Sequence, residues 1–291
     1  MLTKENIKNI YTLSPMQEGM FFHALYDRSS YVYFEQLSYR LQGDLNINFV
    51  KKSLDELFKR YDILRTIFVQ KKAEKVLQVV LKERGVDFYY QDISTGIDTN
   101  SYLREFKEND KGKSFDLSKD VLMRVSVFKT GTEEYEFIWS HHHILMDGWC
   151  VGILVSEFFE IYTSFQENRS YKLAPVTPYK TYIDWLENQD REKSRRYWAG
   201  YLDGYEEAVG IPGRKIGRNE EAGFKNDNLV VTLDPVKTAS LHSLAAAGQV
   251  TPGTIIRAVW GFVLSKYNNR EDVVFGAVVS GRPGEIENVD K

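Results

Sequence analysis

SHHHILMDGW, from Ser140 to Trp149, joins three adjacent histidines to an Asp-Gly pair. The residues before it, 134–140, form a short run of alternating and apolar character that is typical of a strand. After it, apolar residues recur at helical spacing, which predicts a helix over residues 149–166. The histidines are therefore expected at a junction between a strand and a helix.

Similar patterns precede this segment. Residues 33–41 alternate, with Tyr33, Leu37 and Tyr39 on one face, which predicts a half-buried strand. The helical spacing that follows predicts an amphipathic helix over residues 48–61, packed on the sheet. Further strands are expected at residues 65–69, 75–80, 86–90 and 121–129.

The second half of the chain repeats this kind of order. The stretch 169–178 contains two prolines and is expected to cross between two lobes, and residues 210–227 are rich in glycine and charge. Beyond them we expect a strand at 229–233, a helix at 235–247, a helix begun by Thr251-Pro252 that runs to about residue 267, and a strand at 272–279. The order of elements indicates an α/β (α+β) chain of two lobes.

Composition excludes several classes of function. The chain has 291 residues, enough to bury a sizeable core, and a formal net charge of -3 with no basic stripe, which argues against binding to nucleic acid or to an anionic membrane. A single cysteine forbids an internal disulfide, and the first residues contain no apolar signal segment. No stretch has the roughly 20 apolar residues of a membrane span. We expect a cytoplasmic protein.

Adjacent histidines raise the possibility of a metal site. On an extended strand His141 and His143 share one face and His142 faces the other way. At most two of the histidines could therefore coordinate one metal ion, with Asp147 as a possible third ligand. The remaining histidines, His23 and His242, have no ligand spacing around them. No metal is therefore predicted, and a purely structural role for the three imidazoles stays open at this point.

Acyl transfer offers another interpretation. A neutral imidazole at a loop tip can accept a proton from an attacking amine or hydroxyl, while a nearby carboxylate and glycine shape the turn. Cys150 could instead be a nucleophile beside His143. It lies in the first turn of the predicted helix, where a lone cysteine is more often an apolar filler, so we expect a structural role. Trp149 is expected to be a core aromatic at the start of that helix.

The segment HHILMDG (His142 to Gly148) resembles the HHxxxDG motif of condensation domains of nonribosomal peptide synthetases. Other segments resemble the same family, in the family's order, and the resemblance covers essentially the whole chain. They are YTLSPMQEGMFFH (11–23), RYDILRTIF (60–68), YKTYIDWLENQD (179–190), RRYW (195–198) and VVFGAVVSGRPGEI (273–286).

This resemblance implies a chloramphenicol-acetyltransferase-like, two-lobed pseudo-dimer with a tunnel between the lobes. Upstream and downstream peptidyl carrier proteins present thioesters on phosphopantetheine arms, the acceptor amine attacks the donor thioester, and the domain itself binds no cofactor. The motif places the catalytic histidine on His143, with His142, Asp147 and Gly148 in support. The family's aspartate pairs with an arginine, expected here to be Arg65 of the LRT segment.

The resemblance also implies boundaries and a subtype. We expect a docking segment at 1–20 that receives an upstream synthetase subunit, an N-terminal lobe at 10–172 and a partial C-terminal lobe at 173–291. Family domains continue past the SGRP segment, so the second lobe is expected to be incomplete and these residues alone to be inactive. The LSPMQEGMFFH segment is similar to that of domains that join a D-configured donor to an L-configured acceptor.

Other functions share parts of this pattern. An epimerization domain has the same histidine motif but needs a second acid or base across the tunnel. An acyltransferase that uses coenzyme A is disfavoured by the flanking segments. A non-catalytic carrier-binding domain of the same fold usually has a degraded motif, whereas His142, His143, Asp147 and Gly148 are all present here.

Overall fold

The computed structural model describes residues 3–26, 31–70, 75–206, 208–211 and 229–290. The chain divides into two compact units, one of residues 1–189 together with 281–291 and the other of residues 190–280. None of the described helices combines the length and the apolar character of a membrane-spanning segment.

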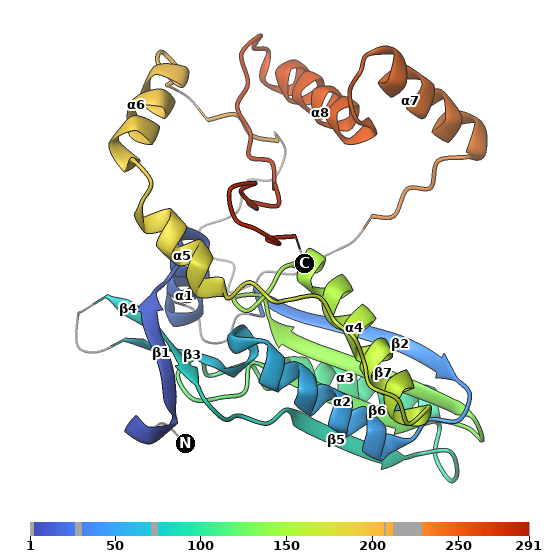
Figure 1. The fold of residues 1–291 in the computed structure, drawn as a ribbon. Helices are drawn as coiled ribbons and strands as arrows, with labels where there is room; N and C mark the ends of the chain where they lie inside the picture. The colour runs from blue at the N-terminus through green and yellow to red at the C-terminus, as the bar shows by residue number, and fades with distance from the viewer. Residues whose placement is uncertain (1–2, 27–30, 71–74, 207, 212–228, 291) are drawn as a thin grey trace. The chain divides into compact units, whose positions relative to one another are not determined.

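A four-stranded sheet is the centre of the first unit (Figure 1). Its strands, in spatial order, are β2 (Phe34–Gln42), β7 (Glu134–His142), β6 (Met123–Lys129) and β5 (Asp87–Asp92). Neighbouring strands are antiparallel except β5 and β6, which are parallel. Helices α2 (Ile47–Arg60) and α4 (Gly148–Gln166) cover one face of this sheet, and α3 (Thr99–Gly112) covers the other.

Strand β7 is buried on both faces. Because side chains alternate along a strand, Phe137 and Trp139 pack with α2 and α4, while Ile138 packs with Phe128 and Leu103 on the side of α3. Trp139 is 1% exposed and is among the largest fully buried side chains. The histidine segment therefore leaves the sheet from its best-packed strand.

A smaller sheet lies beside this core. Its strands are β1 (Ile7–Thr12), β4 (Val76–Leu81) and β3 (Thr66–Gln70), paired antiparallel in that order. Short 3-10 helices, η1 (Lys4–Asn6) and η2 (Asp62–Arg65), precede β1 and β3, and α1 (Pro15–Tyr26) follows β1. Helix α5 (Tyr179–Glu187) packs on this sheet because Ile183 is buried against Tyr11 and Val80.

The second unit contains three described helices. They are α6 (Arg191–Tyr201), α7 (Pro235–Ala247) and α8 (Pro252–Asn268). Helices α7 and α8 each have a proline in the first turn and a capping side chain, Asp234 or Thr251, that accepts a backbone N–H. The bounds of both helices agree closely with those expected from the sequence.

Two predicted strands are wrong. Neither 229–233 nor 272–279 is a strand, and Val230 and Val278 are 85% and 93% exposed. A strand is stable only when its backbone pairs with a neighbour, and neither segment pairs with another described strand, so β-propensity alone does not decide its structure. The glycine-rich and charged stretch lies outside the described residues from 212 onward.

The mixed α/β class is confirmed, whereas the division of the chain differs from the expected one. The expected boundary lay between residues 172 and 173, but the first unit continues to Gln189 because α5 packs on the small sheet. Residues 281–291 also belong to the first unit. This return of the chain brings Arg282 next to the histidine segment.

Candidate functional site

The histidine segment connects β7 to α4 as predicted. Strand β7 ends at His142, and α4 begins at Gly148 with Asp147 as its N-cap. The Asp147 carboxylate accepts a hydrogen bond from the backbone N–H of Cys150 at 3.0 Å. Aspartate is favoured at this position because it satisfies an N–H that has no partner within the helix.

His141 and His142 are buried supports of the segment, 2% and 6% exposed. The Nδ1 atom of His142 accepts a hydrogen bond from the Ile144 N–H at 3.1 Å, so the proton of this neutral ring is on Nε2. Burial, and then the neighbouring His143, lowers the pKa of His142 to about 4, and burial with both neighbours does the same for His141. Both rings are therefore neutral near pH 7.

His143 is half-buried and is held by Tyr33. Its backbone N–H donates to the Tyr33 carbonyl at 2.8 Å, and the two rings lie parallel with centroids 6.5 Å apart. Its Nδ1 is buried and has no hydrogen-bond partner among the described residues. Nε2 is therefore the nitrogen that can reach a substrate.

Tyr33 was expected to lie on the buried face of a strand, and this prediction is wrong. Strand β2 begins at Phe34, and Tyr33 has a φ of 73°, in the left-handed region that residues other than glycine rarely adopt. This backbone conformation turns the chain into β2 and accompanies the parallel packing of Tyr33 on His143. No pattern in the sequence identifies such a position, because tyrosine is typical of strands.

Asp147 pairs with Arg282. The two guanidinium NH groups of Arg282 donate to the two carboxylate oxygens at 2.8 and 2.9 Å. Burial alone raises the pKa of the Asp147 carboxyl, but hydrogen bonds from Arg282 and from the Cys150 N–H outweigh it and hold the pKa far below its usual range. Asp147 is therefore ionised and fully engaged in holding the loop.

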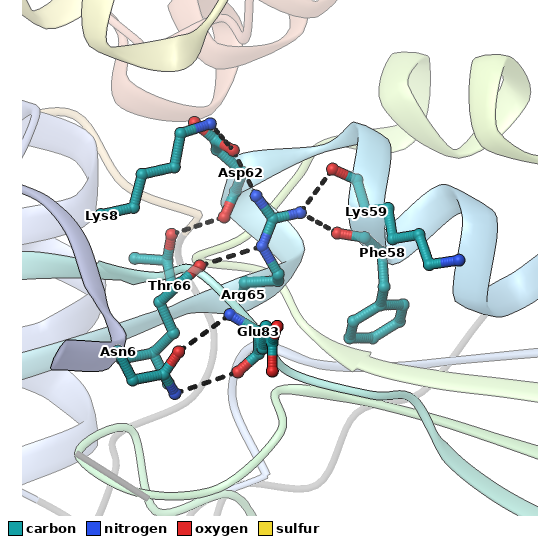
Figure 2. A network of polar contacts seen from close by, with 9 residues as sticks. Asn6, Lys8, Phe58, Lys59, Asp62, Arg65, Thr66 and Glu83 are labelled. Atoms are coloured by element: carbon teal, nitrogen blue, oxygen red, sulfur yellow. Dashed lines mark hydrogen bonds and ion pairs between the residues drawn. The ribbon is translucent and has the colours of Figure 1, made fainter. Parts of the chain in front are cut away.

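The prediction that Arg65 pairs with Asp147 is wrong. Arg65 is 3% exposed and donates to the Leu81 carbonyl at 3.0 Å and to carbonyls at the end of α2, and it forms an ion pair with Asp62 at 2.5 Å. Figure 2 shows this network around Arg65. Asp62 lies three residues before Arg65 in η2, and side chains at that spacing in a helix are neighbours. The Arg65 guanidinium therefore forms its ion pair with Asp62 and not with Asp147.

The observed partner of Asp147, Arg282, lies in a segment that the sequence had already singled out. Arg282 is the arginine of the SGRP motif within the family-like segment 273–286. It lies 135 residues from Asp147, so no local spacing connects the two. Only the return of the chain to the first unit brings them together.

Cys150 does not have the environment of a nucleophile. Burial, and then hydrogen bonding and charge from Asp147, raises the pKa of its thiol to about 11. Almost no thiolate is present at neutral pH. The structural interpretation of Cys150 is favoured by this environment.

Trp149 is not a core residue, so that prediction is wrong. It is 57% exposed, its indole N–H donates to the Asp290 carbonyl at 3.1 Å, and the Arg282 guanidinium lies 5.6 Å from its ring. Together with Gly148 and Gly152 it lines an open pocket of about 620 Å³. A Cβ on Gly148 would meet no atom within 4 Å, so the fold of the described residues does not require glycine there.

Metal coordination has no counterpart in the part of the chain that the structure describes. Within it, no three or more His, Cys, Asp or Glu side chains are grouped so that they could hold a metal ion. The arrangement instead offers one imidazole on a braced loop, which is suited to proton transfer or to positioning.

Comparison with known proteins identifies the family. A family model described as "Condensation domain" matches residues 7–291. Similar proteins include surfactin synthase subunit 3 of Bacillus subtilis (strain 168), 39% identical over 99% of this chain and 23% of the relative, and gramicidin S synthase 2 of Brevibacillus brevis, 42% identical over 99% of this chain and 6% of the relative. Tyrocidine synthase 2 of Brevibacillus parabrevis is 40% identical over 100% of this chain and 8% of the relative. The chain thus spans less than a quarter of each.

Solved structures show the same fold. The first condensation domain of the calcium-dependent antibiotic synthetase, with a substrate analogue, matches with a TM-score of 0.69 and 17% identity, covering 93% of this chain and 66% of that chain. The four-domain nonribosomal peptide synthetase AB3403 matches with a TM-score of 0.74 and 19% identity, covering 90% of this chain and 20% of that chain. The predicted chloramphenicol-acetyltransferase-like fold is confirmed.

Proposed function

The chain belongs to the condensation-domain family, and from this premise we propose that it forms peptide bonds in a nonribosomal peptide synthetase. The amine of a carrier-bound aminoacyl group attacks the carbonyl carbon of an upstream carrier-bound thioester. A C–N bond forms, the C–S bond breaks, and the proton lost by the amine passes through the base to the departing thiolate.

The chemistry makes modest demands on the protein. An α-amino group has a pKa of about 8 and a thiol of about 8.5, so near neutral pH neither a strong base nor a strong acid is needed. Positioning two tethered reactants supplies on the order of 7 to 11 kcal/mol in well-oriented systems. A general base adds about 10²- to 10⁴-fold. These values favour a site that holds one imidazole in place and leaves the rest to substrate alignment.

His143 is the residue that takes this role. The observation that carries the proposal is its difference from its neighbours: His141 and His142 are buried and neutral, while His143 is half-buried, stacked on Tyr33, and has Nε2 available. Asp147 does not take the proton, since both of its oxygens bind Arg282. It holds the loop from which His143 projects.

The partners of the proposed reaction are an upstream and a downstream peptidyl carrier protein, whose phosphopantetheine arms deliver both substrates. The domain itself would bind no cofactor. The relatives named above are synthases, or synthase subunits, of surfactin, gramicidin S and tyrocidine, which supports this setting. The proposed subtype joins a D-configured donor to an L-configured acceptor, on the resemblance of the segment in β1 and α1.

The test is a condensation assay in the complete polypeptide, with both substrates loaded on their carriers. His143→Ala is expected to lower the rate at least 100-fold while the free energy of unfolding changes by less than about 1 kcal/mol, because the ring is half-buried. A variant that keeps most of its rate contradicts the base role. Product with an inverted α-carbon and no amide bond would indicate an epimerization domain, and carrier binding without any reaction a non-catalytic domain.

The proposed docking segment at the N-terminus needs a gentler test than deletion. Residues 7–12 form β1 and pair with β4, so removal of the first ten residues would disrupt the small sheet. Charge reversal at the exposed Lys4 and Glu5 leaves β1 intact. It is expected to slow transfer from a separate upstream protein and to spare a donor fused in cis; equal effects on both would contradict the docking role.

A further inference from the structure

A pocket beside His142 is not used by the reaction described above. It has a volume of about 400 Å³ and is lined by side chains from α1, from residues 31–34 and from residues 114–118. Phenylalanine and tyrosine rings face it: Phe21, Tyr31, Phe34, Phe68 and Phe115. Polar side chains also line it: His23, Gln70, Ser114, Asp116 and Ser118. Small-molecule sites typically have volumes from about 300 to 1,000 Å³ and combine apolar and aromatic walls with a few polar groups.

His142 supplies a buried polar group to this pocket. Its side chain lines the pocket, it is 6% exposed, and its Nδ1 is occupied by the Ile144 N–H. The proton is thus on Nε2, for which the described residues provide no hydrogen-bond acceptor. An occupant with an oxygen atom within reach of this N–H would accept its hydrogen bond.

The wall next to His142 is held in place. Phe115 lies edge-on to the His142 ring at 6.4 Å and is stacked on Phe34 at 5.9 Å. The Arg124 guanidinium lies 4.1 Å from the Phe115 ring, and its Nε donates to the buried Asp110 at 2.9 Å. This wall is therefore held in place before any ligand enters, which reduces the entropy that binding costs.

The carboxylate in the lining is already paired, and the His23 imidazole also lines the pocket. Asp116, whose carboxylate is in the lining, accepts hydrogen bonds from the Ser118 N–H and hydroxyl and pairs with Lys119 at 3.0 Å. An ionised ligand group would lose its hydration without gaining a counter-charge. The chemistry of the walls thus suits an uncharged group with a large apolar surface.

We propose that this pocket receives the uncharged aromatic or long aliphatic side chain of one of the two residues being joined, and that the His142 Nε2–H donates to an oxygen of the same substrate. This inference rests on the proposed function and assigns it a side-chain selectivity. His142 then binds substrate in addition to supporting the loop.

The experiment uses the complete polypeptide with carrier-bound substrates. In one arm the acceptor is varied from Gly to Ala, Leu and Phe with a fixed donor, and in the other the donor's last residue is varied with a fixed acceptor. Leu25→Trp narrows the pocket from its rim, where Leu25 is 45% exposed and not needed for the core. Tyr26→Trp places the same side chain at the next residue of α1, which is 81% exposed, outside the lining and outside residues 1–20.

Leu25→Trp is expected to lower kcat/KM for the Phe and Leu substrates at least 10-fold in one arm and to change kcat/KM for the Gly substrate less than 3-fold. Tyr26→Trp is expected to change kcat/KM for each of these substrates less than 3-fold. The arm that responds identifies the donor or the acceptor as the occupant. Equal effects on Gly and Phe substrates in both arms, or no effect on either, would overturn the inference.

A binding measurement separates this inference from the proposed function. The probe is N-acetyl-4-fluorophenylalanine amide, followed by ¹⁹F NMR, together with the ¹⁵N signal of His142 Nε2. We expect binding to the wild-type chain with a shift of that signal, and at least 10-fold weaker binding to Leu25→Trp. If no substrate is condensed but this binding occurs, only the proposed function fails; if amide product forms and the probe binds both proteins equally, only the pocket assignment fails.

Discussion

The pairing of Asp147 with Arg282 predicts a measurable energetic coupling between residues 135 positions apart. Two charge-assisted hydrogen bonds would each contribute about 1.5 to 3 kcal/mol if fully buried. The Asp147 side chain is 42% exposed and that of Arg282 15%, so solvent screening reduces the coupling to about 1 to 2 kcal/mol. Asp147 is also the N-cap of α4, which adds about 1 kcal/mol to the effect of its removal.

A double-mutant cycle tests these values by urea unfolding. Asp147→Ala is expected to lower the free energy of unfolding by about 2 to 3 kcal/mol and Arg282→Ala by about 1 to 2 kcal/mol. The double variant should lose only about 2 to 3 kcal/mol, because the second substitution removes a partner that is already alone.

The matched control is a second double-mutant cycle, in which Asp147 is paired with Arg65, the partner expected from the sequence. Arg65→Lys weakens the network at the end of α2 but touches nothing on Asp147, so its coupling to Asp147→Ala should stay below about 0.5 kcal/mol. The reasoning is refuted if Arg65 shows the larger coupling, or if the coupling of Asp147 to Arg282 is below about 0.5 kcal/mol.

Three further predictions concern the same loop. Burial and His143 lower the pKa of His141 and His142 to about 4, whereas a histidine in the unfolded chain has a pKa of roughly 6.5, so the unfolded state binds protons first as the pH falls. The free energy of unfolding should therefore be highest above about pH 6.5 and should fall toward pH 4 by about 1.4 kcal/mol per pH unit for each histidine. In urea titrations, His141→Gln is expected to remove about half of this slope. Cys150→Ala should keep the condensation rate within about 3-fold of the wild-type rate. The wild-type Cys150 thiol should react slowly with iodoacetamide at about pH 7.5. A lower rate with unchanged stability would instead indicate that Cys150 is a nucleophile. Gly148→Ala should leave the melting temperature unchanged or slightly raised, since alanine is favoured over glycine in a helix by about 1 kcal/mol and no atom lies within 4 Å of the new methyl group, so a drop in rate would report a ligand in the adjoining pocket.

The sequence by itself determined the elements whose signals are local. Strand β7 and helix α4 were predictable because their apolar residues repeat with the period of a strand or a helix, and their junction placed the histidines correctly. The motif at His142 to Gly148 and its companion segments predicted the family and the fold. Helices α7 and α8 were predictable from Asp234, Thr251 and the prolines that follow them.

Tertiary structure alone decided which residues meet. Arg65 forms an ion pair with Asp62, three positions away. Asp147 pairs instead with Arg282, which the return of the chain to the first unit brings to the loop. Tyr33 leaves the strand pattern to stack on His143, and Trp149 lies at the surface although its type and position predicted the core. Hydrophobic periodicity records which face of an element is buried, but the choice of an ion-pair partner depends on distances across the folded chain, which no local pattern contains.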